Sequence, residues 1–360
     1  MRRVTKRLSF LFCGIIFIVF YCEFLIYYVV IAQCYWPPLT VSKSGADVLK
    51  VFMLTDIHLL GPRGNKFDKM RREWQMHRAF QTILTVHQPD VVFILGDIFD
   101  AGQRVNENQF NNYVDSFHGK FSVPNHIRMY IVAGNHDIGF HNEMSPKRVH
   151  QFYEKLNSKS VRFVTLKNNH FVFINSMTME GDNCAFCKRA RERIEEISEE
   201  LNCSRSPTQC ENVNKTEIIY SQPILIQHFP MSRISDAVCT EPDSVPWYEK
   251  DIPFTPKIEA LSREATDYLA MKIRPRTVFG GHTHYGCTQR HVYDNDTIDF
   301  LEYTIPSFNW RNIFTPKYML VSVTPGEYAI NKCGLPGEHT IVISAVIILL
   351  VTLYVVRKRV

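Results

Sequence analysis

Five short apolar runs in the chain each lead directly into a polar motif that contains Asp, Asn or His. Their length and unbroken hydrophobicity are typical of strands that are buried on both faces. Because open α/β sheets bind their ligands at the carboxyl ends of such strands, we expect the polar motifs to meet at one rim. The runs are residues 51–54, 91–94, 129–132, 224–226 and 277–279.

Strands and helices are predicted to alternate between these runs, as they do in α/β proteins. An apolar residue at every third or fourth position predicts helices, whereas two runs around Asn168-Asn169-His170 predict a hairpin that starts a second sheet. The helices are expected at about 68–87, 106–117, 149–156, 185–201 and 258–273, the hairpin strands at 161–167 and 171–176, and closing strands at 299–304 and 318–323.

Residues 229–257 depart from this regularity. The stretch is rich in Pro, Ser and Asp and contains Trp247-Tyr248, and irregular segments of this length are usually functional or disordered. Because it follows His228 directly, it could overhang the rim and recognise a substrate. A surface insertion under a glycan coat is the alternative, and the sequence leaves both open.

Both ends of the chain carry apolar runs long enough to cross a bilayer, at residues 8–32 and 340–356. The first run is longer than the apolar region of a cleaved signal peptide, which is the alternative. Glu23 lies within it, so we expect this acid to face a partner, to be protonated, or to be tolerated by a very apolar helix.

Basic residues flank the outer end of both runs, before residue 8 and at Arg357-Lys358-Arg359. The positive-inside rule therefore places the tails 1–7 and 357–360 in the cytosol and the domain at 33–339 in a lumen. Arg357-Lys358 resembles a dibasic retrieval signal, which implies contact with a coat or cargo receptor. Stop-transfer charges are the alternative reading.

The charge balance changes once the two ends are set apart. Seven of the 41 Lys and Arg residues lie at the two tips and one of the 36 acidic residues lies in the first run, so the segment between carries 34 basic and 35 acidic residues. Such a segment has no excess of positive charge, which argues against nucleic acid as a partner.

Sequons and cysteines also indicate a secretory compartment. Asn202, Asn214 and Asn295 begin acceptor sequences for N-glycosylation. Four cysteines cluster near the predicted helix at 185–201, with a spacing that allows a zinc site, but an oxidising lumen favours disulfides. Their connectivity is open. The four are Cys184, Cys187, Cys203 and Cys210.

The polar motifs after the five runs, taken in chain order, resemble those of the calcineurin-like metallophosphoesterases over about residues 48–323. One motif alone is a weak signal, but all five in this order are specific. The resemblance implies an α/β fold, a four-layer αββα sandwich, flanked here by an N-terminal and a C-terminal transmembrane helix. The motifs are D-x-H at 56–58, G-D-x-x-D at 96–100, G-N-H-D at 134–137, a lone His228, and G-H-T-H at 281–284.

The same resemblance implies a centre of two divalent metal ions bridged by Asp97. His136 would protonate the leaving oxygen, and Asp100 and Asp137 would orient imidazoles. Carboxylate, imidazole and amide ligands suit manganese, which we favour, as well as zinc or iron. One ion would be bound by Asp56, His58, Asp97 and His284, and the other by Asp97, Asn135, His228 and His282.

The two spans, the luminal placement, the lone His228 and the G-N-H-D motif are together similar to the membrane-bound metallophosphoesterases that remodel glycosylphosphatidylinositol (GPI) anchors. This implies a phosphodiesterase that removes ethanolamine phosphate from a mannose of GPI-anchored proteins and so supports their transport from the endoplasmic reticulum (ER) to the Golgi. It would reside at ER exit sites, the ER-Golgi intermediate compartment and the cis-Golgi. The alternatives are a luminal hydrolase of nucleotides, lipid pyrophosphates or phosphoproteins, and an inactive receptor for phosphorylated glycans.

Overall fold

A computed structural model describes residues 2–40, 47–61, 64–182, 184–206, 219–295 and 297–359. Its strands are β1 Leu49–Leu54, β2 Val91–Ile94, β3 Arg128–Ile131, β4 Val161–Leu166, β5 Asn169–Ile174, β6 Ile224–Ile226, β7 Thr277–Gly280, β8 Cys287–Tyr293, β9 Ile298–Thr304, β10 Lys317–Val323 and β11 Tyr328–Gly334. They form two sheets, one with the order β11-β10-β1-β2-β3 and the other with the order β4-β5-β6-β7-β9-β8. The ligand-bearing strands run parallel within each sheet.

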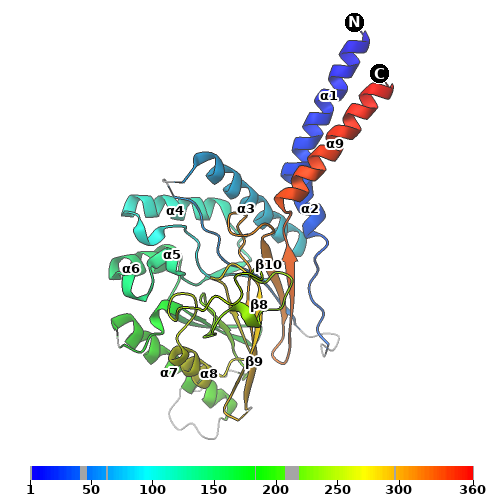
Figure 1. Ribbon diagram of the computed structural model, residues 1–360. Helices are drawn as coiled ribbons and strands as arrows, with labels where there is room; N and C mark the ends of the chain where they lie inside the picture. The colour runs from blue at the N-terminus through cyan, green and yellow to red at the C-terminus, as the bar shows by residue number, and fades with distance from the viewer. Residues whose placement is uncertain are drawn as a thin grey trace.

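The two sheets pack face to face around an apolar core. Val51 and Phe93 of the first sheet meet Phe171 and Phe173 of the second, and the ring of Phe93 lies 5.1 and 4.9 Å from those two rings. Helices α3 (Lys66–His87) and α4 (Glu107–Lys120) cover the outer side of the first sheet, and α7 (Ala185–Arg205) and α8 (Arg263–Ile273) cover that of the second (Figure 1). The predicted four-layer αββα sandwich is confirmed.

The five apolar runs are strands as predicted, and the β4–β5 hairpin pairs Val161 with Ile174 and Leu166 with Asn169. The five strands belong to both sheets, so the rim is shared between the ends of two sheets. Strands β8 and β11 were not predicted. Both lie at sheet edges, where exposed polar residues such as Arg290 interrupt the apolar pattern.

The helix predicted at 258–273 begins five residues later than expected, and this part of the prediction was wrong. Ser262 caps α8 by accepting a hydrogen bond from the Ala265 N–H. The residues before it are held by tertiary contacts, because the Ile258 carbonyl accepts from His282 Nε2 at 2.7 Å. Two short helices, α5 Asn135–Ile138 and α6 Pro146–Lys155, lie between β3 and β4 in the chain.

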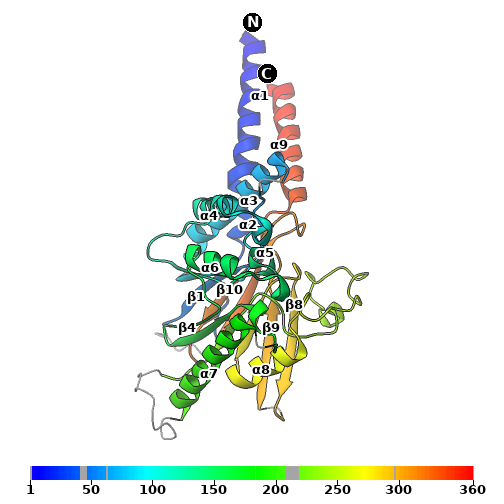
Figure 2. The same cartoon turned by 90° about the vertical axis from the view of Figure 1, so that its left-hand side faces the viewer.

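The terminal helices stand apart from the sandwich (Figures 1 and 2). Helix α1 (Arg2–Phe20) leads through a π-helical turn, η1 (Tyr21–Leu25), into α2 (Ile26–Ile31), and α9 (Glu338–Arg359) lies beside α1. Both are long and apolar enough to cross a membrane, and both termini lie at the end far from the sandwich. A Cβ on Gly14 would lie 2.3 Å from Thr352 Cγ2, so glycine permits this close helix contact.

Glu23 has partners on the sandwich. Arg71 Nη1 donates to Glu23 Oε1 at 2.7 Å, and Trp74 Nε1 donates to Glu23 Oε2 at 2.8 Å. Beyond this point Ile26 and Tyr27 are buried against the domain. The expectation of a partner for this acid is therefore confirmed, and the first apolar run packs on the sandwich through its second half.

Disulfides fasten three places in the described part of the chain: Cys34–Cys333, Cys184–Cys187 and Cys239–Cys287. Cys203 is also disulfide-bonded, and Cys210 lies outside the described residues. The preference for disulfides over zinc near residue 185 is thus confirmed for its first pair.

Two of the three sequons lie on the described surface. Asn202 is exposed in the last turns of α7, and Asn295 is exposed in the turn between β8 and β9. Asn214 lies outside the described residues.

Candidate metal centre

The predicted ligands meet where strands of both sheets end. Each residue of a group offers one ligand atom, and the ligand atoms within a group lie within 4.8 Å of one another. The groups follow the two ligand sets expected from the sequence, although the assignment to metal ions stays a prediction. The first group is Asp56, His58 and His284, and the second is Asp97, His228 and His282.

Asp97 lies between the two groups. Its Oδ2 is 3.7 Å from His58 Nε2 and 3.2 Å from His228 Nε2, whereas its Oδ1 accepts from the His136 N–H at 2.8 Å. Asn135 Oδ1 joins the second group at 3.2 Å from His228 Nε2. One carboxylate oxygen therefore faces both groups, as a bridging ligand must.

Backbone carbonyls fix the rings of the second group. His228 Nδ1 donates to the Leu95 carbonyl at 2.6 Å, and His282 Nε2 donates to the Ile258 carbonyl at 2.7 Å. A carbonyl only accepts, so the proton is on the nitrogen facing it and the other nitrogen is left for a ligand, which is how metal-binding histidines are usually held.

Two buried atoms of the cluster have no hydrogen-bond partner among the described residues, namely Asp56 Oδ1 and His282 Nδ1. The other oxygen of Asp56 accepts from Thr55 Oγ1 at 2.9 Å and from the His282 N–H at 3.0 Å. Buried polar atoms rarely lack a partner, and a borderline divalent cation accepts both carboxylate oxygen and imidazole nitrogen. The residues present fit divalent metal ions.

The backbone is left-handed at most of the candidate ligands. This conformation is uncommon for residues other than glycine and concentrates at functional sites. Glycines complete the loops, because a Cβ on Gly134 would lie 2.1 Å from Asp97 Oδ1. The φ angles are 54° at Asp56, 45° at His58, 50° at Asp97, 75° at His282 and 65° at His284.

Burial and mutual charge set the protonation of the cluster. Burial disfavours the charged form of Asp97, but His228 and His58 outweigh it and hold the pKa of Asp97 below its usual range. Burial lowers the pKa of His228, but Asp97 outweighs it and raises the value to about 9. Burial, together with His228, lowers the pKa of His282 to about 3. Asp97 is therefore anionic and His282 neutral, the forms that bind cations, whereas His228 carries a second proton on Nε2 beside Asp97, which cation binding would release.

His136 lies beside the two groups. Its ring centroid is 4.7 Å from that of His58, and its Nδ1 donates to the Asp100 carbonyl at 2.7 Å. The Asp100 carboxylate lies 3.9 Å from His58 Nδ1. Asp100 thus positions one imidazole through its main chain and faces another with its side chain, and Nε2 of His136 is the nitrogen left to reach a substrate.

Asp137 does not orient an imidazole, so that part of the prediction was wrong. Its two carboxylate oxygens accept from the N–H groups of Phe99 and Gly134, both at 2.9 Å. A carboxylate held by two backbone amides ties the loop after β2 to the loop after β3. Asp137 therefore stabilises the backbone around Asp97 by binding the amides of these two loops, and it does not position an imidazole ring.

Three buried side chains that were not predicted hold the motif loops. Ser176 Oγ accepts from the His228 N–H at 3.2 Å, and Ser307 Oγ donates to the Asp56 carbonyl at 2.8 Å. Asn309 Nδ2 donates to the next carbonyl along, at 2.7 Å. Of these three residues, only Ser176 could have been identified from the sequence, because it lies at the end of a predicted strand.

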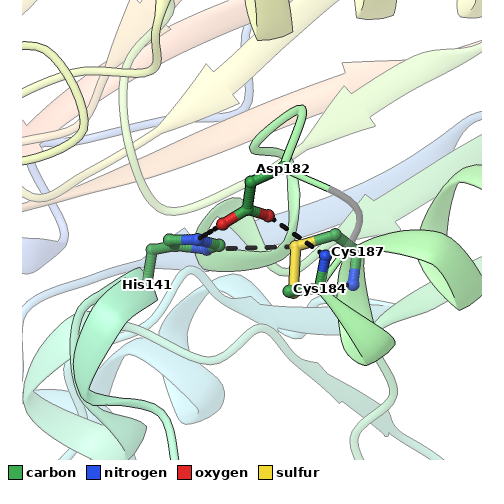
Figure 3. Close-up of side chains that lie close together, drawn as sticks. All are labelled: His141, Asp182, Cys184 and Cys187. Carbon is green, nitrogen blue, oxygen red and sulfur yellow. Dashed lines mark hydrogen bonds and ion pairs between the residues drawn. A yellow bond between two sulfur atoms is a disulfide. The ribbon is translucent and has the colours of Figure 1, made fainter.

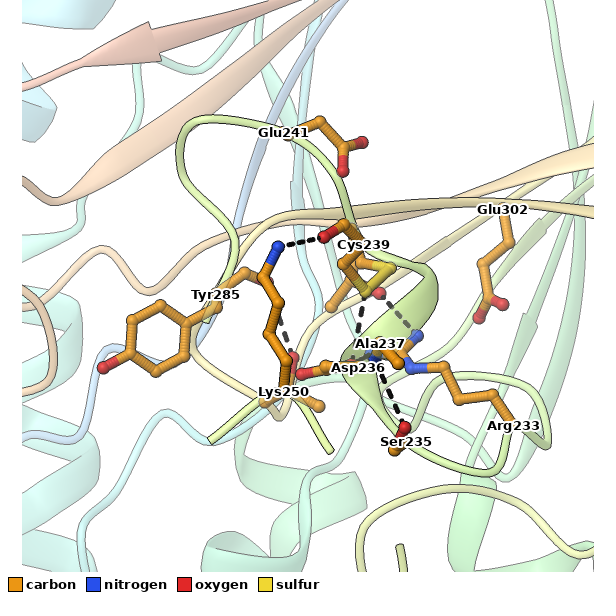
Figure 4. Close-up of a disulfide and its surroundings, with 12 residues drawn as sticks. Arg233, Ser235, Asp236, Ala237, Cys239, Glu241, Lys250, Tyr285 and Glu302 are labelled. Atoms are coloured by element: carbon orange, nitrogen blue, oxygen red, sulfur yellow. Dashed lines mark hydrogen bonds and ion pairs between the residues drawn. A yellow bond between two sulfur atoms is a disulfide. The ribbon is translucent and has the colours of Figure 1, made fainter. Parts of the chain in front are cut away.

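The 229–257 segment lies against the rim and is fastened in place. The Cys239–Cys287 disulfide joins it to β8, and Lys250 Nζ donates to the Cys239 carbonyl at 2.6 Å (Figure 4). Arg233 pairs with Asp236 at 2.7 Å within the segment. Residues of the 229–257 segment also line a cavity beside His282, so the position of the segment agrees with a role at the site.

A second cluster of ligand-type residues lies around the Cys184–Cys187 disulfide at the start of α7 (Figure 3). His141 Nδ1 contacts the Met177 carbonyl at 2.9 Å, and its Nε2 contacts Asp182 Oδ2 at 2.7 Å. Both nitrogens of the ring are therefore engaged, and both sulfurs are bonded to each other.

Known proteins resemble the chain in its sequence. The family model described as Calcineurin-like phosphoesterase matches residues 49–286. The chain is 44% identical over 322 residues to Metallophosphoesterase 1 homolog of Drosophila melanogaster, covering 89% of this chain and 84% of the fly protein. It is 41% identical over 353 residues to Metallophosphoesterase 1 of Gallus gallus, covering 94% and 87%, and 42% identical over 334 residues to that of Mus musculus, covering 91% and 83%.

Proposed function

The chain belongs to the calcineurin-like phosphoesterase family and is a metal-dependent phosphoesterase, and from this premise we propose that it is a membrane-bound phosphodiesterase of GPI anchors. It removes the ethanolamine phosphate side branch from a mannose of the anchor glycan and so supports transport of GPI-anchored proteins from the ER to the Golgi. The observation that carries the catalytic part is the Asp97 oxygen that faces both ligand groups.

Two divalent ions are assigned to the cluster, with manganese favoured over zinc or iron. When bound, such ions supply positive charge to the phosphoryl oxygens and lower the pKa of a water molecule. The chain holds the ligand atoms in place through the carbonyls and the left-handed loops. One ion is assigned to Asp56, His58, Asp97 and His284, and the other to Asp97, Asn135, His228 and His282.

His136 supplies the proton for the leaving oxygen. The Asp100 carbonyl accepts from Nδ1, so a protonated ring presents its second N–H, at Nε2, to the substrate. Transfer of that proton to the mannose oxygen as the phosphorus–oxygen bond breaks avoids release of an alkoxide. His136 thereby acts on the leaving group and not on the metal ions.

The terminal helices support a substrate that is itself anchored to a membrane. A GPI-linked glycan and an enzyme held by α1 and α9 are confined to the same surface, which raises their effective concentration for each other. The phosphoesterase centre provides the chemistry for a phosphate branch. A hydrolase of free nucleotides would gain nothing from this confinement.

We place both tails in the cytosol and the sandwich in the lumen, with residence between ER exit sites and the cis-Golgi. The basic residues at both tips, which lie at the same end of the molecule (Figure 1), support this orientation. The Arg357-Lys358 pair is available to a coat or cargo receptor on that side. Asn202 and Asn295 are exposed and serve as glycosylation sites in this orientation.

The test is mass spectrometry of GPI glycans from cells that lack this protein, rescued with the native chain or with His136→Ala. We expect an extra ethanolamine phosphate on mannose that only the native chain removes. Unchanged glycans in the deficient cells would overturn the anchor substrate and favour another luminal phosphate ester. If both the native chain and His136→Ala remove the ethanolamine phosphate, the proton transfer must be assigned to another group. An inactive receptor would leave a chromogenic phosphodiester intact.

A further inference from the structure

A cavity of about 230 Å³ opens beside the candidate metal centre, between the 229–257 segment and the G-H-T-H turn. His282 and Thr283 form the wall nearest the metal centre. Glu249, Glu259, Phe254 and Tyr285 also line the cavity. The cavity thus combines carboxylates with apolar and aromatic surface, directly next to a candidate metal ligand.

Two of the three carboxylates that line this cavity form no ion pair with a basic side chain of the described residues. Asp236, which also lines it, is paired with Arg233. In contrast, no Lys or Arg of the described part of the chain forms an ion pair with Glu249 or Glu259, and Glu259 Oε2 accepts only the Thr255 N–H, at 2.7 Å. Burial and the charge of Glu249 raise the pKa of Tyr285. The cavity therefore carries uncompensated negative charge.

The walls are fixed before any ligand arrives. The Cys239–Cys287 disulfide holds the segment to β8 close to Tyr285 (Figure 4). The carbonyl of Ile258, next to Glu259, accepts from His282 Nε2. A site whose walls are already in place loses less conformational entropy on binding, which favours affinity.

A second cavity, of about 340 Å³, is lined in part by Asp100 and shares no lining residue with the first. Its walls include Arg104, Gln109, Tyr113 and Arg311, which are polar groups suited to a sugar. Since the Asp100 carbonyl holds His136, this cavity is on the side of the leaving group. The cavity beside His282 is then left for the substituent that stays on the phosphorus.

We infer that the cavity lined by Glu249 and Glu259 binds the organic ammonium group of the phosphodiester, the protonated amine of its ethanolamine end. This inference rests on the proposed phosphodiesterase function and adds the residues that select the substrate. Two carboxylates provide charge for the ammonium, and the ring of Tyr285 provides surface that favours an alkyl cation. The ring of Phe254 adds apolar wall, and its centroid already lies 5.2 Å from the Arg233 guanidinium. A metal cation would be poorly served by the apolar part of the wall.

The test compares two chromogenic diesters that differ in one group. The metal-loaded full chain is assayed with 2-aminoethyl 4-nitrophenyl phosphate and with propyl 4-nitrophenyl phosphate, in which a methyl group replaces the ammonium. We expect kcat/KM to be higher for the aminoethyl ester by about tenfold or more, as the loss of hydrogen bonds to a charged group implies. The double variant Glu249→Gln/Glu259→Gln should lose this preference while hydrolysing the propyl ester as the native chain does.

Asp251→Asn is the matched control, because Asp251 is exposed in the same segment and does not line the cavity. This variant should keep the native preference although it removes a negative charge from the same segment. Equal rates for the two esters in the native chain, or a preference that survives in the double variant, would overturn the ammonium site and leave the phosphodiesterase standing. If the native chain hydrolyses neither ester, the proposed function fails and the inference falls with it.

Discussion

The candidate metal centre and the cluster around Cys184–Cys187 both bring Asp and His side chains together, but they differ in which ligand atoms remain without a hydrogen bond. In the metal centre Asp56 Oδ1 and His282 Nδ1 have no hydrogen-bond partner among the described residues. In the other cluster both nitrogens of His141 are engaged and the sulfurs form a disulfide. Proximity alone does not make a metal site. A histidine can bind a metal ion only if a hydrogen bond to one ring nitrogen leaves the lone pair of the other nitrogen directed at the site.

Asp97→Ala should give the largest effect. This side chain faces both ligand groups, and loss of a supporting residue alone already costs about 10- to 100-fold in metal affinity, so both ions should be lost together with activity. Metal content per purified chain, measured by inductively coupled plasma mass spectrometry, checks this. Asp182→Ala in the second cluster is the control and should keep the native content. Two ions retained by Asp97→Ala would contradict the bridging role.

His136→Ala should separate catalysis from metal binding. Because the ring lies beside the ligand groups, we expect native metal content and a kcat lower by about 10²- to 10⁴-fold, the usual contribution of a general acid. The measurement pairs metal analysis with hydrolysis of a diester whose leaving group is a poor one, such as a sugar. A variant that loses metal as fully as Asp97→Ala would sink this division of roles.

Ser176→Ala should have a smaller effect, a loss of stability in the loop that carries His228. Removal of its hydroxyl leaves the buried N–H groups of His228 and Phe229 without their partner, at a cost of about 1–3 kcal/mol. Thermal unfolding of the detergent-solubilised protein should show the loss. Ser160→Ala, which removes a hydroxyl bonded to Thr178, is the comparison. An unchanged melting temperature in Ser176→Ala would argue that the loop is held by other contacts.

Cys184→Ser/Cys187→Ser should have the smallest effect on function. The disulfide closes a short loop, so its removal should cost about 2 kcal/mol at most, whereas metal content and kcat should match the native chain. The same metal analysis and diester assay check this. A drop in bound metal in this variant would mean that the second cluster does hold an ion.

Much of the fold and of the candidate site could be predicted from the sequence, because buried parallel strands leave long apolar runs and the polar motifs follow them. Edge strands such as β11 escaped notice, since one of their sides faces solvent and their pattern is mixed. Asp and His adopt the left-handed backbone more often than most residues, but this preference alone does not single out Asp56 and His58 among the acids and histidines of the chain. The role of Asp137 was misassigned because the identity of an acid does not show whether an amide or an imidazole lies in front of it.

The ion pair between Glu23 and Arg71 helps to fix the distance between the sandwich and the membrane-spanning part of the chain. Together with the Cys34–Cys333 disulfide it joins the first apolar helix to the sandwich at more than one point, so the sandwich cannot swing freely on a flexible stalk. The rim that carries the candidate metal centre is then held at a fixed distance from the bilayer. Under the proposed function, a phosphate branch of an anchor glycan would be within reach only if its sugar stands at that distance from the lipid, so the enzyme would select among identical branches by their position.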